Sequence, residues 1–245
     1  MAQRSTSSKL KAIQEVQSAT ETAMRSAVHY LRTSATPTSK GARDAIHRAL
    51  RALQCECPEG IIVAGGKQSA DPHATGRGRL APGDPIVVDI FPRSRETGYF
   101  ADMSRTFCIG APRPKLKKMY AAVLGAQRLA FSMIRPGACG EDIQTAVDQY
   151  FEQKGFHRKN PRKKGGKGWL AEEGFIHGVG HGVGKKNHEP PKISYGKDIL
   201  REGDIVTVEP GLYYKDVGGV RLEDMVLVTK RGCANLTRFS KKLIL

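Results

Sequence analysis

Gly83-Asp84-Pro85-Ile86-Val87-Val88-Asp89 has a counterpart in the second half of the chain, Gly203-Asp204-Ile205-Val206-Thr207-Val208-Glu209. In both stretches a Gly-Asp turn leads into an apolar strand that ends in a carboxylate. A second acidic residue then follows inside another apolar stretch, Asp102 thirteen residues after Asp89 and Glu223 fourteen residues after Glu209. Repeats of this kind indicate duplicated architecture. We therefore infer an internal duplication about a pseudo-twofold axis, although chance similarity between short strands is the simpler alternative.

The segments around the repeat occur twice in the same order, two helices separated by a proline break and then strands. Apolar residues near a 3.6-residue period predict the helices, and short apolar runs predict the strands. Ser39 is the expected cap of the second helix, and residues 1–7 are expected to form a polar tail. The expected helices span 8–33, 40–54, 115–134 and 140–154, and the expected strands 61–63, 86–90, 104–109, 204–209, 211–214 and 220–229.

Length and composition limit the class of protein. The 245 residues fit one domain or two small ones, and we expect a single catalytic domain, 1–245, with halves at about 8–130 and 131–240. The sequence has no apolar run near the roughly 18 residues of a membrane span and no apolar signal at its start. Five cysteines, an odd number, indicate reduced thiols in a cytoplasmic protein rather than a disulfide scaffold.

The chain is strongly basic, with a formal net charge of +16. Such a charge favours contact with nucleic acid, ribosomes or other anionic partners, although a solvated basic surface explains it equally simply. Residues 157–168 contain six Lys or Arg residues and no apolar residue, which predicts a flexible basic loop. This loop is the candidate contact for RNA or an acidic partner.

The four repeated carboxylates, Asp89, Asp102, Glu209 and Glu223, indicate a metal site. A carboxylate within a buried strand is costly unless it is paired or binds a cation. A salt bridge or a strand-end cap would explain any one of them alone. A pseudo-twofold axis, however, would bring all four together, where they repel one another unless cations lie between them. Two divalent ions about 3.5–4 Å apart would satisfy such a cluster.

Histidines add to this interpretation. Three histidines lie inside one glycine-rich segment of twelve residues, at His177, His181 and His188. Glycines in such a segment let backbone or substrate approach closely. Imidazole is a common ligand of borderline metals. A single histidine would more simply be structural, but three beside a predicted carboxylate cluster favour a functional site. His73 precedes the Asp89 strand as His188 precedes the Glu209 strand, which alone is a weak signal.

Together these motifs resemble the M24 pita-bread metallopeptidase family, which includes methionine aminopeptidases, aminopeptidase P and prolidase. The resemblance covers about residues 8–240. It rests on Asp-Ile at 89–90, Ala-Asp-Met-Ser-Arg-Thr-Phe at 101–107, His-Gly-Val-Gly-His-Gly-Val-Gly at 177–184, Val-Glu-Pro-Gly-Leu-Tyr at 208–213 and Val-Arg-Leu-Glu-Asp at 220–224. It implies an α+β fold of duplicated half-domains, with a curved antiparallel sheet covered by helices.

The resemblance also implies a set of metal ligands. Asp89 would chelate one ion, Asp102 and Glu223 would bridge two, and His181 and Glu209 would complete the second. The mainly oxygen donor set suits Mn, Co or Fe, with Zn as a further alternative. Glu209 would also act as general base and later protonate the leaving amine. His73 and His188 would hold the substrate and the tetrahedral intermediate.

The branch of the family follows from the neighbouring residues. His177 matches a substrate-side histidine of the proline-specific branch, and Arg221 matches an arginine there that lies close to the metal carboxylates. Methionine aminopeptidases usually carry Phe where this chain has Asn187. Against this, the proline-specific enzymes usually carry an N-terminal domain that we expect to be missing here. The spacing from Asp89 to Asp102 is longer than in methionine aminopeptidases, which predicts a longer hairpin at about 92–97.

These motifs are compatible with three functional hypotheses. The first is a dinuclear-metal exopeptidase that removes the N-terminal residue of Xaa-Pro peptides, as an aminopeptidase or a dipeptidase. A methionine aminopeptidase is the alternative. The third is a non-catalytic module of the same fold that binds RNA or ribosomes, which the full set of five metal-ligand types disfavours. We expect a peptide substrate, no membrane partner, and a monomer or homodimer.

Overall fold

The computed structural model describes residues 2–159, 162–163 and 169–245. Its long helices are α1 (Ala2–Thr33), α2 (Ser39–Ala52), α3 (Pro114–Met133) and α4 (Gly140–Gln153). All four correspond to helices predicted from the apolar periodicity. The expected polar tail at residues 1–7 is wrong from Ala2 onward, because Ala, Gln and Arg are good helix formers and continue α1 beyond its apolar stripe. None of the described helices has the length and apolarity needed to cross a bilayer.

The first half of the chain forms a three-stranded antiparallel sheet in the order β2-β3-β5. Its strands are β2 (Ile61–Gly65), β3 (Ile86–Ile90) and β5 (Met103–Phe107). The 3-10 helix η1 (Gly66–Ala70) follows β2. The predicted hairpin extension is present as well, since β4 (Arg93–Ser94) lies on it and pairs with β1 (Cys55–Glu56).

The second half forms a five-stranded sheet in the order β14-β13-β10-β8-β9, and a separate hairpin of β11 and β12. The expected strand at 220–229 is interrupted at Leu222 and Glu223, so that β12 and β13 belong to different sheets. The strands are β8 (Gly180–Gly182), β9 (Glu189–Ile193), β10 (Ile205–Val208), β11 (Gly211–Tyr214), β12 (Gly218–Arg221), β13 (Asp224–Thr229) and β14 (Gly232–Asn235), with a further pair of β6 (Arg162–Lys163) and β7 (Trp169–Leu170).

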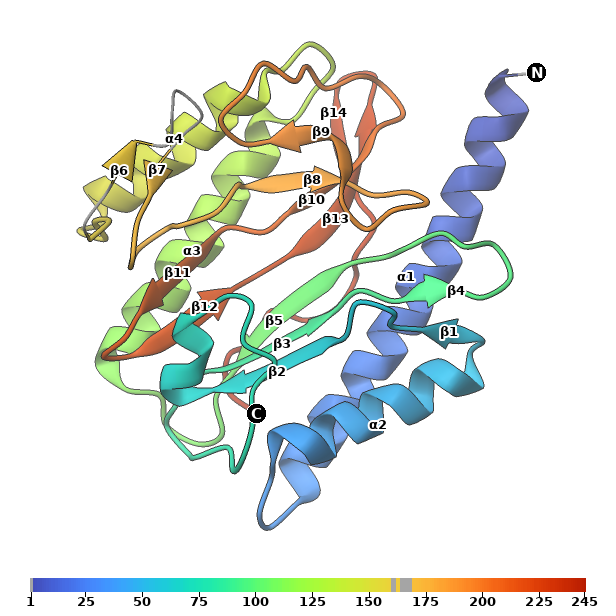
Figure 1. The fold of residues 1–245 in the computed structure, drawn as a ribbon. Helices are drawn as coiled ribbons and strands as arrows, with labels where there is room; N and C mark the ends of the chain where they lie inside the picture. The colour runs from blue at the N-terminus through green and yellow to red at the C-terminus, as the bar shows by residue number, and fades with distance from the viewer. Residues whose placement is uncertain (1, 160–161, 164–168) are drawn as a thin grey trace.

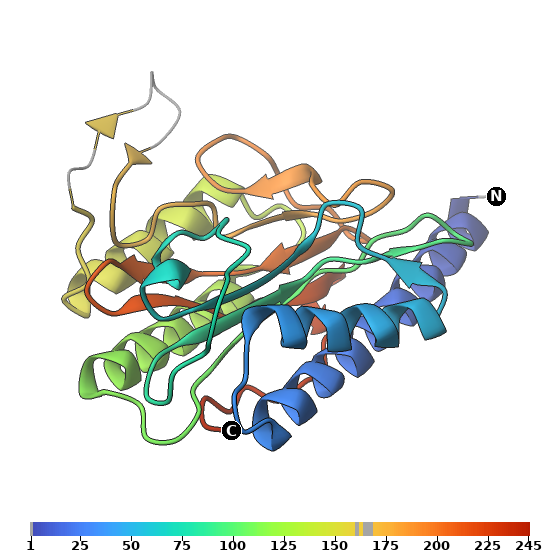
Figure 2. The same cartoon turned by 60° about the horizontal axis from the view of Figure 1, so that its bottom comes forward.

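Helices cover one side of the strands in both halves. Figure 1 shows α1 and α2 beside the β2-β3-β5 sheet and α3 and α4 beside the five-stranded sheet, and the turned view in Figure 2 places α1, α2 and α3 below the strands. Contacts of α1 with β3, α2 with β2, α3 with β10 and α4 with β9 agree with these views. The four helices leave the opposite face of the strands, the one seen in Figure 1, uncovered.

The buried apolar side chains form two clusters, one beside α1 and α2 and one beside α3 and α4. Burial of such side chains is the main favourable contribution to folding. One cluster joins α1 and α2 to the first sheet, with Ile13, Met24, Ile46, Val63, Val88 and Met103 among its members. The other joins α3 and α4 to the second half, with Leu116, Val123, Val147, Phe151, Val206 and Val226 among its members.

Candidate metal centre

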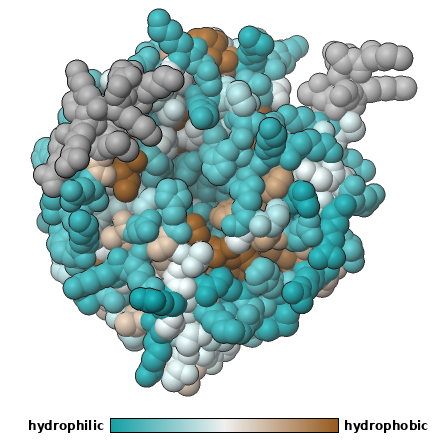
Figure 3. All heavy atoms as spheres, viewed as in Figure 1, coloured by the Kyte–Doolittle hydropathy of each residue, from teal (hydrophilic) through white to brown (hydrophobic). Residues whose placement is uncertain are grey.

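The five residues expected to bind metal come from separate elements of the two halves. Asp89 lies on β3, Asp102 directly before β5, and His181 on β8. Glu209 follows β10, and Glu223 lies in the interruption between β12 and β13. All five line one cavity of about 520 Å³. Figure 3 shows a recess near the centre of the face seen in Figure 1, bordered mainly by hydrophilic side chains.

Close distances join the donor atoms of these side chains. His181 Nε2 lies 3.3 Å from Glu209 Oε1 and 3.8 Å from Asp102 Oδ2. One donor atom each from Asp102, His181 and Glu223 lies within 4.8 Å of the others. Asp89 lines the same cavity, so the four carboxylates of the repeat lie together there with one imidazole beside them.

The electrostatics of the cluster fit a cation site. Burial, reinforced by the charges of Glu223 and Asp89, raises the pKa of Asp102 well above its usual range. Burial likewise raises the pKa of Glu223, with the charges of Glu209 and Asp89 adding to the effect. Burial also raises the pKa of Glu209, with Arg221 opposing the shift. These directions show carboxylates crowded together with too little positive charge among them.

Unpaired oxygens support the same conclusion. Asp89 Oδ1 and Asp102 Oδ1 are buried and have no hydrogen-bond partner among the described residues. A buried polar atom without a partner is unfavourable and calls for an explanation such as an ion or a water molecule. Hard oxygen donors together with one imidazole are a donor set that divalent transition metals accept. The residues present therefore fit a divalent metal centre.

Arg221 holds one side of the cluster in place. Its Nη2 donates to Asp89 Oδ2 at 2.7 Å, its Nε to Ser104 Oγ at 2.8 Å and its Nη1 to the Tyr213 hydroxyl at 2.9 Å. Arg221 is 3% exposed. A buried guanidinium with these fixed acceptors orients the Asp89 carboxylate, whose other oxygen, Oδ1, is buried without a partner among the described residues.

The other histidines surround the cluster at different depths, and each lines the same cavity. His177 Nε2 lies 2.8 Å from the Tyr213 hydroxyl, and burial lowers the His177 pKa to about 3. Burial also lowers the pKa of His181 to about 4, so its ring is neutral near pH 7 and free to act as a ligand. The ring of His188 lies 4.0 Å from that of His181 between centroids, and His73 is exposed at the rim.

Two residues of the site carried no sequence prediction of their own. Tyr213 joins His177 to Arg221 through its hydroxyl, and burial raises its pKa to about 12. It belongs to the Val-Glu-Pro-Gly-Leu-Tyr stretch, in which the sequence predicts a role only for the glutamate. Ser104 bonds Arg221 from β5, where nothing in the sequence separates it from an ordinary strand serine.

The predicted basic loop at 157–168 lies partly outside the described residues, which omit 160–161 and 164–168. Within the described part, the backbone of Arg162–Lys163 pairs with that of Trp169–Leu170, so a short strand pair replaces loop structure there. Lys159 forms an ion pair with Glu173.

Comparisons with known proteins agree with this geometry. The sequence model of metallopeptidase family M24 matches residues 11–230. The Xaa-Pro dipeptidase of Pyrococcus horikoshii is 35% identical over 185 residues, which are 75% of this chain and 48% of that protein. The probable dipeptidase PepE of Mycobacterium tuberculosis is 36% identical over 186 residues, 75% of this chain and 45% of that protein. The chain thus spans about half the length of these curated relatives.

Solved structures show the same likeness. The prolidase from Pyrococcus horikoshii OT3 superposes with a TM-score of 0.84 at 30% identity, covering 97% of this chain and 64% of that one. The X-Pro aminopeptidase from Thermotoga maritima gives 0.83 at 28% identity, covering 98% of this chain and 64% of that one. The expected α+β pita-bread fold is confirmed.

Proposed function

The chain belongs to metallopeptidase family M24, and from this premise we propose that it is a metal-dependent exopeptidase that cleaves after the first residue of Xaa-Pro peptides. The observation that carries the proposal is the convergence of Asp89, Asp102, His181, Glu209 and Glu223 on one cavity, with two buried oxygens lacking partners among the described residues. Such a centre suits metal-assisted hydrolysis.

Two divalent ions are the proposed complement of this centre, and they would be held by the side chains of Asp89, Asp102, His181, Glu209 and Glu223. Mn, Co or Fe suits the oxygen-rich donors, with Zn as an alternative. When bound, such ions supply Lewis acidity and a nucleophilic water at neutral pH.

The side chains themselves account for the proton transfers. Glu209 lies beside His181 within the cavity, where its carboxylate is placed to accept a proton from the attacking water. The same proton then passes to the proline nitrogen, which must be protonated to leave. His188 and His73, at the rim of the cavity, are placed to donate to the developing oxyanion.

The proposed Xaa-Pro specificity is supported by His177 and Arg221. The Tyr213 hydroxyl links these two side chains by hydrogen bonds. The relatives named Xaa-Pro dipeptidase and prolidase point the same way. The length of peptide that the cavity accepts decides between two activities. An aminopeptidase would release the first residue of a longer peptide, whereas a dipeptidase would split an Xaa-Pro dipeptide into two amino acids.

We further propose that residues 1–245 form one catalytic domain of two halves, about 8–130 and 131–240, although α3 packs into the apolar cluster of the second half. A cytoplasmic location is favoured by five cysteines that are free thiols.

An RNA or ribosomal contact through 157–168 is a secondary proposal. It predicts affinity that falls with salt by about one unit of log-log slope per phosphate contact. Affinity that does not change with salt would contradict it.

The direct test is hydrolysis by chelator-stripped protein after addition of Mn, Co or Zn, with Met-Ala-Ser and Ala-Pro-Ala as substrates. Ala-Pro should be tested beside them, because a dipeptidase cleaves only the shorter prolyl peptide. We expect metal-dependent cleavage of a prolyl peptide. Cleavage of the methionyl peptide alone would support metal-dependent hydrolysis but contradict the proposed Xaa-Pro specificity. If none of the three peptides is cleaved while metal is bound, the proposed function is wrong.

A further inference from the structure

Asn187 has a side chain that the metal centre does not explain. It is 2% exposed and lines the cavity, and its Oδ1 has no hydrogen-bond partner among the described residues. Among the described residues that line this cavity, the other two unpaired buried side-chain oxygens belong to Asp89 and Asp102, where the proposed cations would account for them. Burying an amide without a partner is unfavourable. A molecule that fills the cavity would supply the missing donor.

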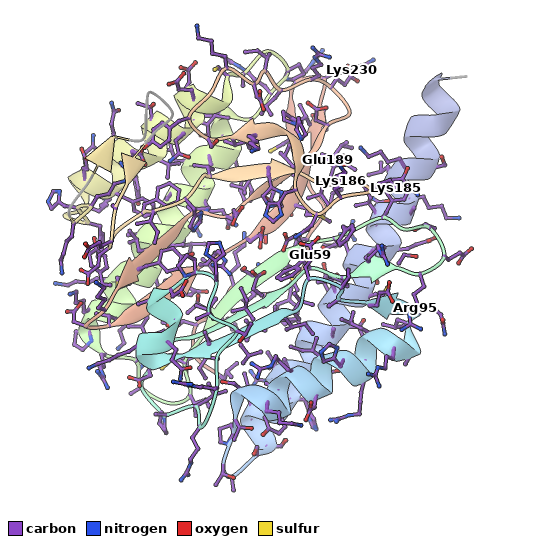
Figure 4. All side chains as sticks on the ribbon, viewed as in Figure 1. Glu59, Arg95, Lys185, Lys186, Glu189 and Lys230 are labelled. Atoms are coloured by element: carbon purple, nitrogen blue, oxygen red, sulfur yellow. The ribbon has the colours of Figure 1, made fainter. Side chains whose placement is uncertain are left out.

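Glu59 offers a second acceptor in the same cavity. It lies on the exposed turn between β1 and β2, and no ion pair of Glu59 is found within the described part of the chain. Its neighbour Glu56, by contrast, is paired with Arg93 and Arg95. Figure 4 shows Glu59 facing the segment that carries Lys186 and Glu189, and Asn187 lies on that segment.

On the basis of the proposed function, we propose that Asn187 and Glu59 form a subsite for the side chain of the substrate's first residue and select a cationic side chain, Lys or Arg. Proline has no N–H within a peptide and no donor in its ring. In an Xaa-Pro dipeptide every donor therefore belongs to the first residue. Its α-ammonium is two bonds from the scissile carbonyl carbon and stays beside the metal centre. Only a long side chain reaches Glu59 at the rim.

The chemistry of the two acceptors fits an ammonium or guanidinium group. Either cation carries several N–H donors, enough for a carboxylate and an amide oxygen together. A site built to bond such a group discriminates against an analogue that lacks it, because the buried acceptor is then left unpaired. Lys186, on the facing segment and without an ion pair among the described residues, opposes this selection.

The test compares Lys-Pro with norleucine-Pro, which has the same carbon chain without the ammonium. The readout is the ratio of kcat/KM for the two dipeptides, measured by proline release from the metal-loaded full chain. We expect wild type to favour Lys-Pro by about tenfold, and Glu59→Gln or Asn187→Leu to lower that ratio by about fivefold. Glu56→Gln is the matched control and should leave the ratio unchanged. Glu59→Lys should bring the ratio of kcat/KM for Lys-Pro to that for norleucine-Pro below one, and Lys186→Gln should raise this ratio.

Equal or weaker cleavage of Lys-Pro by wild type would overturn the subsite while leaving the exopeptidase assignment intact. The subsite would also be overturned if Glu59→Gln or Asn187→Leu lowered kcat/KM by the same factor for both dipeptides. An equal loss is expected when the mutated residue binds the α-ammonium, which both dipeptides have. Failure of wild type to cleave any prolyl peptide would instead overturn the proposed function, and the subsite would fall with it.

Discussion

The carboxylates of the cavity are the residues on which the proposed chemistry depends. We expect Asp102→Asn and Glu223→Gln each to lower kcat/KM more than about 100-fold and to reduce bound metal, because each removes a donor from a centre that needs all of them. The loss of activity is measured as kcat/KM for hydrolysis of Ala-Pro, and the loss of metal as the metal content of each purified variant.

The same two substitutions should not unfold the metal-free chain. Both carboxyls have pKa values raised by burial and by neighbouring negative charge, so removing one relieves repulsion. The free energy of unfolding without metal should stay the same or rise. Activity that survives either change would show that the ligands are misassigned.

Tyr213 gives a second test at the scale of one residue. Tyr213→Phe removes the hydroxyl between Arg221 and His177 and should cost about 1–2 kcal/mol of stability, with a loss of about tenfold in kcat/KM on prolyl peptides. Tyr214→Phe is the matched control, because its hydroxyl bonds the His157 carbonyl outside the cavity. Equal kinetic losses in both variants would refute the role of Tyr213.

Residues of the site differ in how far the sequence predicts them. An acidic residue such as Asp89 inside an apolar strand is conspicuous because its burial is costly. Tyr213, Ser104 and Asn187 are ordinary in their local sequence, and their roles depend on which side chains the two halves bring next to them. Only the three-dimensional arrangement supplies that information.

At the scale of elements, close approach of strands sets the position of His181. A Cβ on Gly180 would lie 2.0 Å from the Thr207 carbonyl oxygen of β10. Gly180→Ala should therefore force β8 and β10 apart, costing about 1–3 kcal/mol of stability and most of the activity. Gly232→Ala is the control, since its nearest atom would be the Ile134 carbonyl oxygen at 4.0 Å. Thermal melts and hydrolysis rates separate the two.

The start of α2 gives a prediction that depends only on local geometry. The helix is capped by Thr38, whose side chain accepts from the Gly41 N–H at 3.0 Å, and not by the expected Ser39. Ser39 Oγ is instead buried without a partner among the described residues. Thr38→Ala should cost about 1 kcal/mol, whereas Ser39→Ala should be neutral or stabilising. Urea unfolding of the two variants checks this, and the reverse order would contradict it.

Apolar patterning predicts the helices and seven of the fourteen strands in the described part of the chain, but it misses others such as β8, β9 and β14, and it does not give the ends or interruptions of elements. The apolar run at 220–229 reads as one strand, yet Glu223 divides it into β12 and β13. Its N–H donates to the Ser104 carbonyl at 3.0 Å, which ties the break to β5 of the other half. Hydrogen bonds between residues so far apart in sequence leave no local signal, so the sequence alone predicts a continuous strand.

For the whole molecule, the cavity lies where the two halves meet. Asp89 and Asp102 come from the half whose core involves α1 and α2, and the other three proposed ligands from the half built on α3 and α4. The halves are also joined without metal, since Arg105 of β5 pairs with Asp224 of β13 at 2.8 Å in full burial. Metal should therefore add to the stability of a molecule that is already folded, rather than create its fold.

This arrangement predicts that removing metal lowers Tm without abolishing cooperative unfolding. A ligand at 100 times its Kd contributes about 2.7 kcal/mol, and a chain of this size gains about 2–4 °C per kcal/mol. We therefore expect chelation to lower Tm by about 5–10 °C in a melt that stays a single transition. Glu223→Gln should show little of this shift, because its donor set is incomplete. A chelation shift of equal size in the variant would place the metal elsewhere, and two separate transitions would mean that the halves fold independently.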